Sequence, residues 1–236
     1  MLVAVTLPIS ASAPLLCAYP TPDFVKATPM TSRLPAKART IPAEPEQYGL
    51  GRSLTATILR LSRHAAALCF LSFAIFIAMT VLEFFYFRQL SGGLPSLDMR
   101  FFGFTPDEGM AWLTALGRRG SETILVWHYL TFDLLFPALL SLTLVSLILA
   151  TGRRLKNFRV LPPQVQSIFA LVLVLPYTIA DYAQNIAVAR LLSDFLSANP
   201  DSLSFASTLI VTKFALLAIP VVVIAAFWLV DQRRQA

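Results

Sequence analysis

The chain has 236 residues, of which 56% are hydrophobic and only 14% are charged, and its mean hydropathy is +0.68. A soluble domain needs a polar surface, so this composition excludes an ordinary soluble protein and predicts an integral membrane protein. The net charge of +6 would suggest nucleic acid as the partner of a soluble protein, but here we expect the lipid bilayer and no nucleic acid.

Residues 1–60 are predicted to form a disordered cytoplasmic tail, because they are rich in proline and have no sustained apolar period after residue 20. Met30 is a second candidate start of the chain. The remaining residues, 61–236, are predicted to form a single transmembrane domain.

Four apolar runs in that domain are long enough to cross a bilayer, since about 20 helical residues span ~30 Å of hydrocarbon. They cover residues 65–87, 124–150, 165–192 and 205–230. Backbone polar groups find no water inside a bilayer, and four segments cannot close a barrel, so each run must be a helix. The predicted fold class is all-α, a bundle of four transmembrane helices.

Basic residues are concentrated in segments that lie on one side of such a bundle. They are Lys26, Arg33, Lys37, Arg39, Arg52, Arg60 and Arg63 before the first span, Arg153, Arg154, Lys156 and Arg159 between the second and third, and Arg233 and Arg234 at the end. By the positive-inside rule we expect both termini in the cytoplasm and a multi-pass protein of the cell membrane, inner or plasma.

The outer loop between the first two spans contains a helix-start pattern. Thr105 suits the N-cap position, Pro106 the first helical position, and Glu108 completes a capping box. We expect a short extracytoplasmic helix that ends near Leu116, because Gly117 suits the left-handed position after a helix.

Polar residues inside the spans lie roughly 6–16 Å from the outer end, at 1.5 Å per residue. They are Glu83, His128, Asp133, Asp181, Gln184, Asn185 and Lys213. Asp181, Gln184 and Asn185 share one helical face. Such residues usually face the interior of a bundle, so we predict an interior polar site, with Asp98 and Arg100 tying the outer loop over it.

Pro137 stands four residues after Asp133 and removes the hydrogen bond that the Asp133 carbonyl would accept in a regular helix. Two interpretations of the site stay open. One is a hydrated cavity with Asp133 and Asp181 opposite Lys213, which binds a polar ligand or passes a proton. The other is a structural ion pair that holds the helices together.

Several kinds of chemistry lack their sequence pattern. No HExxH, GxxxxGK[ST] or GxSxG motif is present, and His64 and His128 lie at opposite ends of the bundle, which excludes a bis-histidine haem within one chain. We therefore predict neither a metal site nor a cofactor.

The chain resembles a poorly characterised family of small four-span bacterial membrane proteins. The elements of the resemblance are Asp98-Met99-Arg100, Gly103-Phe104-Thr105, Leu116-Gly117, Asp133 with Phe136-Pro137, and Asp181-Tyr182 with Asn185. Gln184 stands where the pattern has Glu, and Ile124 where it has an aromatic residue. The resemblance implies a four-helix membrane protein but brings no activity.

The leading functional hypothesis is a non-enzymatic protein that belongs to a small-solute or ion pathway or is a partner in a membrane complex, and transport would require a homo-oligomer. The first alternative is a membrane-embedded enzyme acting on a lipid or isoprenoid headgroup. There Asp133 or Asp181 would be the general base and Lys213 an electrostatic stabiliser. The second alternative is a purely structural bundle.

Overall fold

The computed structural model describes residues 50–235. Every element in this range is a helix, which confirms the all-α prediction. Most of the predicted tail and the candidate start at Met30 lie outside the described residues.

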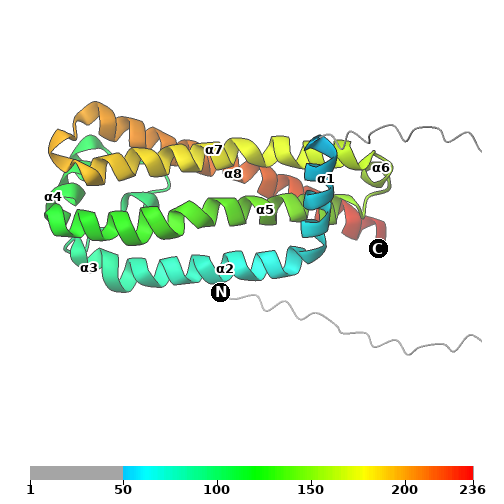
Figure 1. Ribbon diagram of the computed structural model, residues 1–236, viewed down its shortest axis with the longest axis horizontal. Helices are drawn as coiled ribbons and strands as arrows, with labels where there is room; N and C mark the ends of the chain where they lie inside the picture. Colours follow the sequence, from blue (N-terminus) through cyan, green and yellow to red (C-terminus); the bar gives the residue numbers. More distant parts are fainter. Residues whose placement is uncertain (1–49, 236) are drawn as a thin grey trace, which may run out of the picture. The chain divides into compact units, whose positions relative to one another are not determined.

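Four helical stretches are long and apolar enough to cross a membrane: Thr55–Leu90, Pro106–Gly152, Pro163–Ser193 and Pro200–Gln235. The first contains α2 (Ala65–Leu82), the π-helical segment η2 (Glu83–Phe87) and α3 (Arg88–Leu90). The second contains α4 (Pro106–Ile124), the π-helical segment η4 (Leu125–Phe132) and α5 (Asp133–Gly152). The third and fourth are α7 (Pro163–Ser193) and α8 (Pro200–Gln235), and Figure 1 shows α2, α5, α7 and α8 side by side. The four predicted spans are confirmed, and each helical stretch extends beyond the predicted limits.

The helix α1 (Leu50–Leu61) corrects the prediction that disorder continues to residue 60. It lies across α5 and α7, and Ile58 and Leu59 pack on the core there (Figure 1). A 3-10 turn (Ser62–His64) joins it to α2. The segment has an apolar face, so its helicity depends on packing against the bundle, which a composition-based prediction of disorder does not detect.

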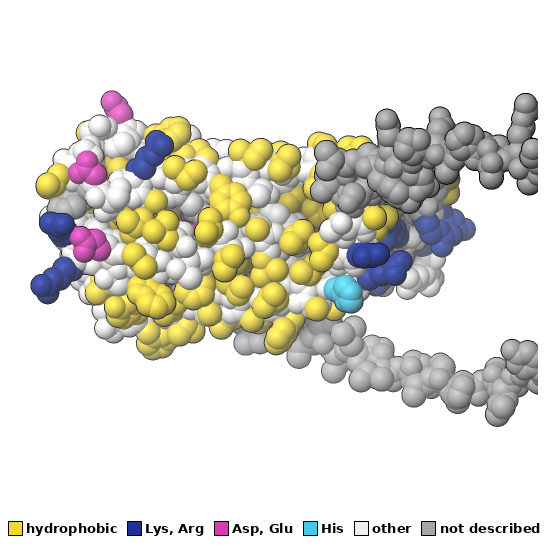
Figure 2. Space-filling model, viewed as in Figure 1, with side chains coloured by type: hydrophobic (Ala, Val, Ile, Leu, Met, Phe, Trp, Pro, Cys, Tyr) yellow, Lys and Arg dark blue, Asp and Glu magenta, His cyan; other side chains and the backbone are white. Residues whose placement is uncertain are grey.

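The two ends of the bundle differ in charge. The basic end holds α1, α6 (Lys156–Arg159) and the last turns of α8, and Figure 2 shows Lys and Arg side chains gathered there. The loop end holds residues 91–105 and the connection between α7 and α8, including η5 (Phe195–Ser197). Hydrophobic side chains cover the middle of the visible face, as lipid contact requires (Figure 2).

The predicted capping box at the start of α4 is confirmed. The backbone N–H of Thr105 donates to Glu108 Oε2 at 2.8 Å, and the Glu108 N–H donates to Thr105 Oγ1 at 3.3 Å. Gly117 has the expected positive φ, 58°. With ψ −171° the backbone at Gly117 is not helical, so α4 consists of two helices that meet at a kink there. The second of them reaches Ile124 and continues through η4 into α5. The predicted short loop helix is therefore confirmed, and it precedes the second span without an intervening loop.

The loop over residues 91–105 is docked on α8. Gly103 has φ +88°, and a Cβ atom at this position would meet Ser207 Oγ at 2.8 Å. The next residue, Phe104, donates its backbone N–H to the same Ser207 Oγ at 2.8 Å. Leu97, in the 3-10 turn η3 (Leu97–Met99), is fully buried. This docking holds η3 against the helices of the bundle.

Candidate functional site

The loop-end half of the bundle contains a buried group of polar residues that we call the polar cluster. It consists of Glu83 in η2, Asp98 in η3, His128 in η4, Asp133 in α5, Asp181, Gln184 and Asn185 in α7, and Lys213 in α8. Every member except Asp98 is buried, and Asp98 is nearly so. The structure thus brings together all seven polar residues that the sequence predicted within the spans, and it adds Asp98 from the loop.

Lys213 connects α8 to α7 and to the loop. Its Nζ donates to Asp181 Oδ1 at 3.0 Å and to Gln184 Oε1, and it lies 3.6 Å from Asp98 Oδ1. The Gln184 side-chain amide donates to the same Asp98 oxygen at 2.6 Å. Burial alone would raise the pKa of Asp98, but the Lys213 ammonium, with His128 and the Tyr129 hydroxyl, holds that pKa below its usual range. Asp98 is therefore ionised at neutral pH.

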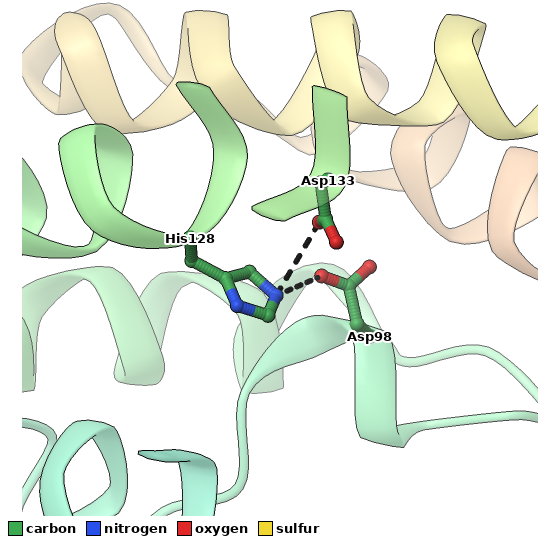
Figure 3. Close-up of side chains that lie close together, drawn as sticks. All are labelled: Asp98, His128 and Asp133. Carbon is green, nitrogen blue, oxygen red and sulfur yellow. Dashed lines mark ion pairs between the residues drawn. The ribbon is translucent and has the colours of Figure 1, made fainter. Parts of the chain in front are cut away.

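His128 stands between two carboxylates (Figure 3). Its Nε2 lies 3.3 Å from Asp98 Oδ2 and 3.3 Å from Asp133 Oδ2. Neither contact is aligned as a hydrogen bond, and Nδ1 also lacks a partner among the described residues. The Tyr129 hydroxyl donates to Asp98 Oδ2 at 2.6 Å. Asp98 thus turns one oxygen toward Lys213 and the other toward His128.

The carbonyl that Pro137 leaves free has a partner on the next helix. The Asn185 side-chain amide donates to the Asp133 backbone oxygen at 2.9 Å. Pro137 in the second span and the polar face of α7 are therefore linked through one contact. A buried carbonyl without a donor costs about 1–3 kcal/mol, which is what Asn185 offsets here.

Other polar atoms of the cluster have no partner among the described residues. Glu83 accepts a 2.9 Å hydrogen bond from the Ser96 backbone N–H through Oε1, while its Oε2 is buried and unpaired. Asn185 Oδ1 and both ring nitrogens of His128 are also buried and unpaired. Buried polar groups are nearly always satisfied, so these four atoms of the cluster have hydrogen-bonding capacity that the described side chains do not use.

The arrangement differs in part from the sequence expectation. Lys213 meets Asp181, whereas Asp133 meets His128. Arg100 pairs with Glu108 at 3.4 Å, away from Asp98, so the two loop residues do not act together. Sequence reasoning missed Tyr129 and Tyr177, whose hydroxyl donates to Asp181 Oδ2 at 2.7 Å. The position of Tyr177, four residues before Asp181, was the available signal.

Two members of the cluster lie in π-helical segments. Glu83 is the first residue of η2, and His128 lies in the middle of η4. A π-helical turn adds a residue to the helical repeat and changes the direction of the side chains after it, and such turns are frequent at functional sites. In this protein the π-helical segments η2 and η4 distinguish the helices at the polar cluster from regular α-helix.

A cavity of about 430 Å³ adjoins the polar cluster. Its polar end is formed by Glu83, Asp98, His128, Asp133, Asp181 and Lys213. The remainder is mainly apolar, with side chains from α2, α5 and α8 that include Phe73, Phe76, Phe136, Leu140, Phe214 and Leu217. The lining residues on α2 and η2 run from Cys69 to Glu83, a stretch of helix about 21 Å long at 1.5 Å per residue.

The apolar part of the cavity borders the surface that faces lipid. Phe73 and Phe76 line it and are 61% and 51% exposed. The helix α2 packs mainly against α5, whereas the cavity is lined from both α2 and α8. One wall of the cavity is therefore α2, a helix that is attached to the rest of the bundle mainly through α5.

Comparison with known protein families, with characterised proteins and with solved structures finds no match for this chain. The similarity to a four-span bacterial family consequently stays a prediction from the residue pattern. What the geometry establishes is a bundle with four helices able to span a membrane and a buried polar cluster at one end of an amphipathic cavity.

Proposed function

We propose that the protein takes a lipid-like amphipathic molecule from the bilayer and holds its polar end against the polar cluster. The observation that carries the proposal is the cavity itself, polar at one end, mainly apolar over the rest of its wall, and lined by the exposed Phe73 and Phe76. Its volume falls in the range of about 300–1,000 Å³ typical of small-molecule sites. The basic end would face the cytoplasm, which places the polar cluster in the outer half of the membrane.

The charge of the cavity favours one chemical class of polar head group on the ligand. Four carboxylates line it, those of Glu83, Asp98, Asp133 and Asp181, and only two bases, His128 and Lys213. Even with His128 protonated, ionised carboxylates would leave two negative charges without a cationic partner. An amine or hydroxyl head suits this environment, while a free anionic head would be repelled.

The test is photocrosslinking in nanodiscs with a photoreactive long-chain amine. Leu140→Trp places a bulky ring in the cavity and should reduce labelling at least 10-fold. Leu175→Trp is the matched control, because Leu175 is 52% exposed and does not line the cavity. Equal labelling of both variants would refute the proposal. A matched long-chain carboxylate should label wild type more weakly than the amine does.

A small-solute or ion pathway is the second proposal. The favouring observation is the chain of close charged groups that leads from the loop through Asp98 to His128 and Asp133. On the basic side of the cluster, however, Leu144, Ile148 and Leu149 belong to a packed apolar core, so conduction needs a rearrangement or a homo-oligomer. Loss of flux in proteoliposomes by the Asp133→Asn variant would support this proposal over amphipath binding.

A further inference from the structure

We propose that Asp98, His128 and Asp133 form a binding site for a divalent first-row metal ion such as Zn²⁺ or Mn²⁺. One ligand atom from each of the three residues lies within 4.8 Å of the other two. The residues come from the loop turn η3, from η4 and from the start of α5, and Figure 3 shows their side chains converging on one point. This inference goes beyond amphipath binding and does not depend on it.

The spacing of the atoms fits a shared metal. Ligands about 2.0–2.2 Å from an ion, at tetrahedral or octahedral angles, lie roughly 2.8–3.6 Å from one another. His128 Nε2 is 3.3 Å from the Oδ2 atoms of both Asp98 and Asp133. An imidazole nitrogen with two carboxylate oxygens is a donor set suited to zinc, iron and manganese.

A protonated His128 explains the same geometry less well. An imidazolium has two N–H donors, and here both ring nitrogens are buried without an aligned acceptor. A single N–H shared between two carboxylates makes two weaker, poorly aligned bonds, and Nε2 is equally distant from both. A metal ion bound to Nε2 accounts for this equal spacing, since it contacts the nitrogen and both oxygens together.

The surroundings favour a cation at this point. The carboxylates that line the cavity outnumber its bases, so a divalent ion with neutral His128 brings the site closer to neutrality than a proton does. Lys213 is engaged with Asp181 and Gln184, and the nearest oxygen of Asp98 to it is Oδ1. Oδ2 accepts the Tyr129 hydroxyl and has a second lone pair for the metal. Three protein ligands leave a coordination position open toward the cavity, the arrangement found in catalytic metal sites.

The experiment uses tag-free protein in detergent, stripped with EDTA and titrated with Co²⁺ as a coloured probe, with metal content measured by mass spectrometry. Wild type should bind one ion per chain with ligand-field absorption. His128→Gln should weaken binding at least about 100-fold, more than the 10–100-fold typical of outer-shell changes. Tyr129→Phe, which removes the hydrogen bond to Asp98, should weaken it about 10–100-fold.

The chain supplies a matched control in its other histidine. His64 is exposed in the turn before α2, so His64→Gln should bind Co²⁺ as wild type does. If His128→Gln does not fold, Asp98→Asn in the loop is tested in its place. Equal affinity in wild type and in the ligand variants, or no uptake by wild type, would overturn the proposal. The assay contains no amphipath, so its failure and the failure of crosslinking are separate results.

Discussion

The two halves of the bundle use opposite means to hold the same four helices together. In the loop-end half, ionisable side chains from six elements, η2, η3, η4, α5, α7 and α8, meet in the polar cluster, and two of these elements are π-helical. In the basic-end half, Leu144, Ile148, Leu149 and Val174 form an apolar core between regular helices. The few polar contacts there include the 2.8 Å hydrogen bond between Ser72 and Thr143.

Comparing the two halves shows which kinds of side chain the bundle needs for stability alone. The middle of the basic-end half shows that the helices can pack with apolar side chains and hydroxyl pairs. Its buried Asp231 and Gln166 contact Arg154 and Arg153. Charged groups in hydrocarbon are expensive and rare, so the loop-end half carries a cost that the other half avoids. Polar groups retained at such a cost usually serve a function, and removing them residue by residue measures how much of the cluster is structural.

The largest effect is expected for Lys213→Met. It leaves Asp181 and Asp98 buried without their cation, and breaking a buried pair from one side costs roughly 3–5 kcal/mol. The free energy of unfolding in detergent measures the loss. Adding Asp181→Asn should restore part of it, with a coupling of about 0.5–3 kcal/mol. Additive losses would mean that the two residues do not stabilise each other.

Gln184→Leu should cost about 3 kcal/mol, because fully buried Gln184 accepts from Lys213 and donates to Asp98. The free energy of unfolding in detergent measures this loss as well. Gln184→Glu keeps the acceptor for Lys213 but sets a second carboxylate against Asp98, so at neutral pH it should cost at least as much stability as Gln184→Leu, and less at low pH. A leucine variant as stable as wild type would show that the hydrogen bonds of Gln184 add nothing to stability.

Asn185→Leu should cost about 1–3 kcal/mol, because it leaves the Asp133 carbonyl without a donor. Pro137→Ala supplies a backbone N–H that can bond this carbonyl within the helix. The loss in Asn185→Leu should therefore be smaller in a Pro137→Ala background, as thermal unfolding can test. If Asn185→Leu loses as much stability in the Pro137→Ala background as in wild type, Asn185 stabilises the fold through another atom, for example its unpaired Oδ1.

Ser72→Ala should have the smallest effect, about 0.6 kcal/mol, the average for a hydrogen bond between membrane helices. It breaks the contact with Thr143 in the basic-end half. Thr143 keeps a 2.9 Å hydrogen bond to the Leu139 carbonyl, so no donor is left unpaired. A loss as large as that of Asn185→Leu, again by thermal unfolding, would remove the distinction between the two halves.

Features that depend on local chain chemistry were predictable from the sequence. Length and composition predicted the four spans, and the capping box predicted the start of α4 at Pro106. The helical spacing of Asp181, Gln184 and Asn185 predicted a polar face on α7, and these three residues are indeed buried in the cluster. The free Asp133 carbonyl followed from Pro137 alone.

Contacts that depend on the rotation of whole helices and on loop docking were not predictable. His128 reaches Asp133 and Asp98 from a π-helical segment, whose changed repeat cannot be anticipated from regular helical spacing. Asp98 enters the cluster because the loop is docked on Ser207 through Gly103 and Phe104. The proposed metal site of Asp98, His128 and Asp133 spans 36 positions of the chain and has no short motif.

The pairing of Lys213 with Asp181 also bears on how the protein enters the membrane during synthesis. The two residues are 32 positions apart, and the six residues 194–199 join their helices. When α7 leaves the ribosome, its aspartate has no cationic partner on any earlier span, because Lys213 has not yet been made. Insertion of α7 and α8 together as one hairpin lets the two charges neutralise each other before either meets hydrocarbon.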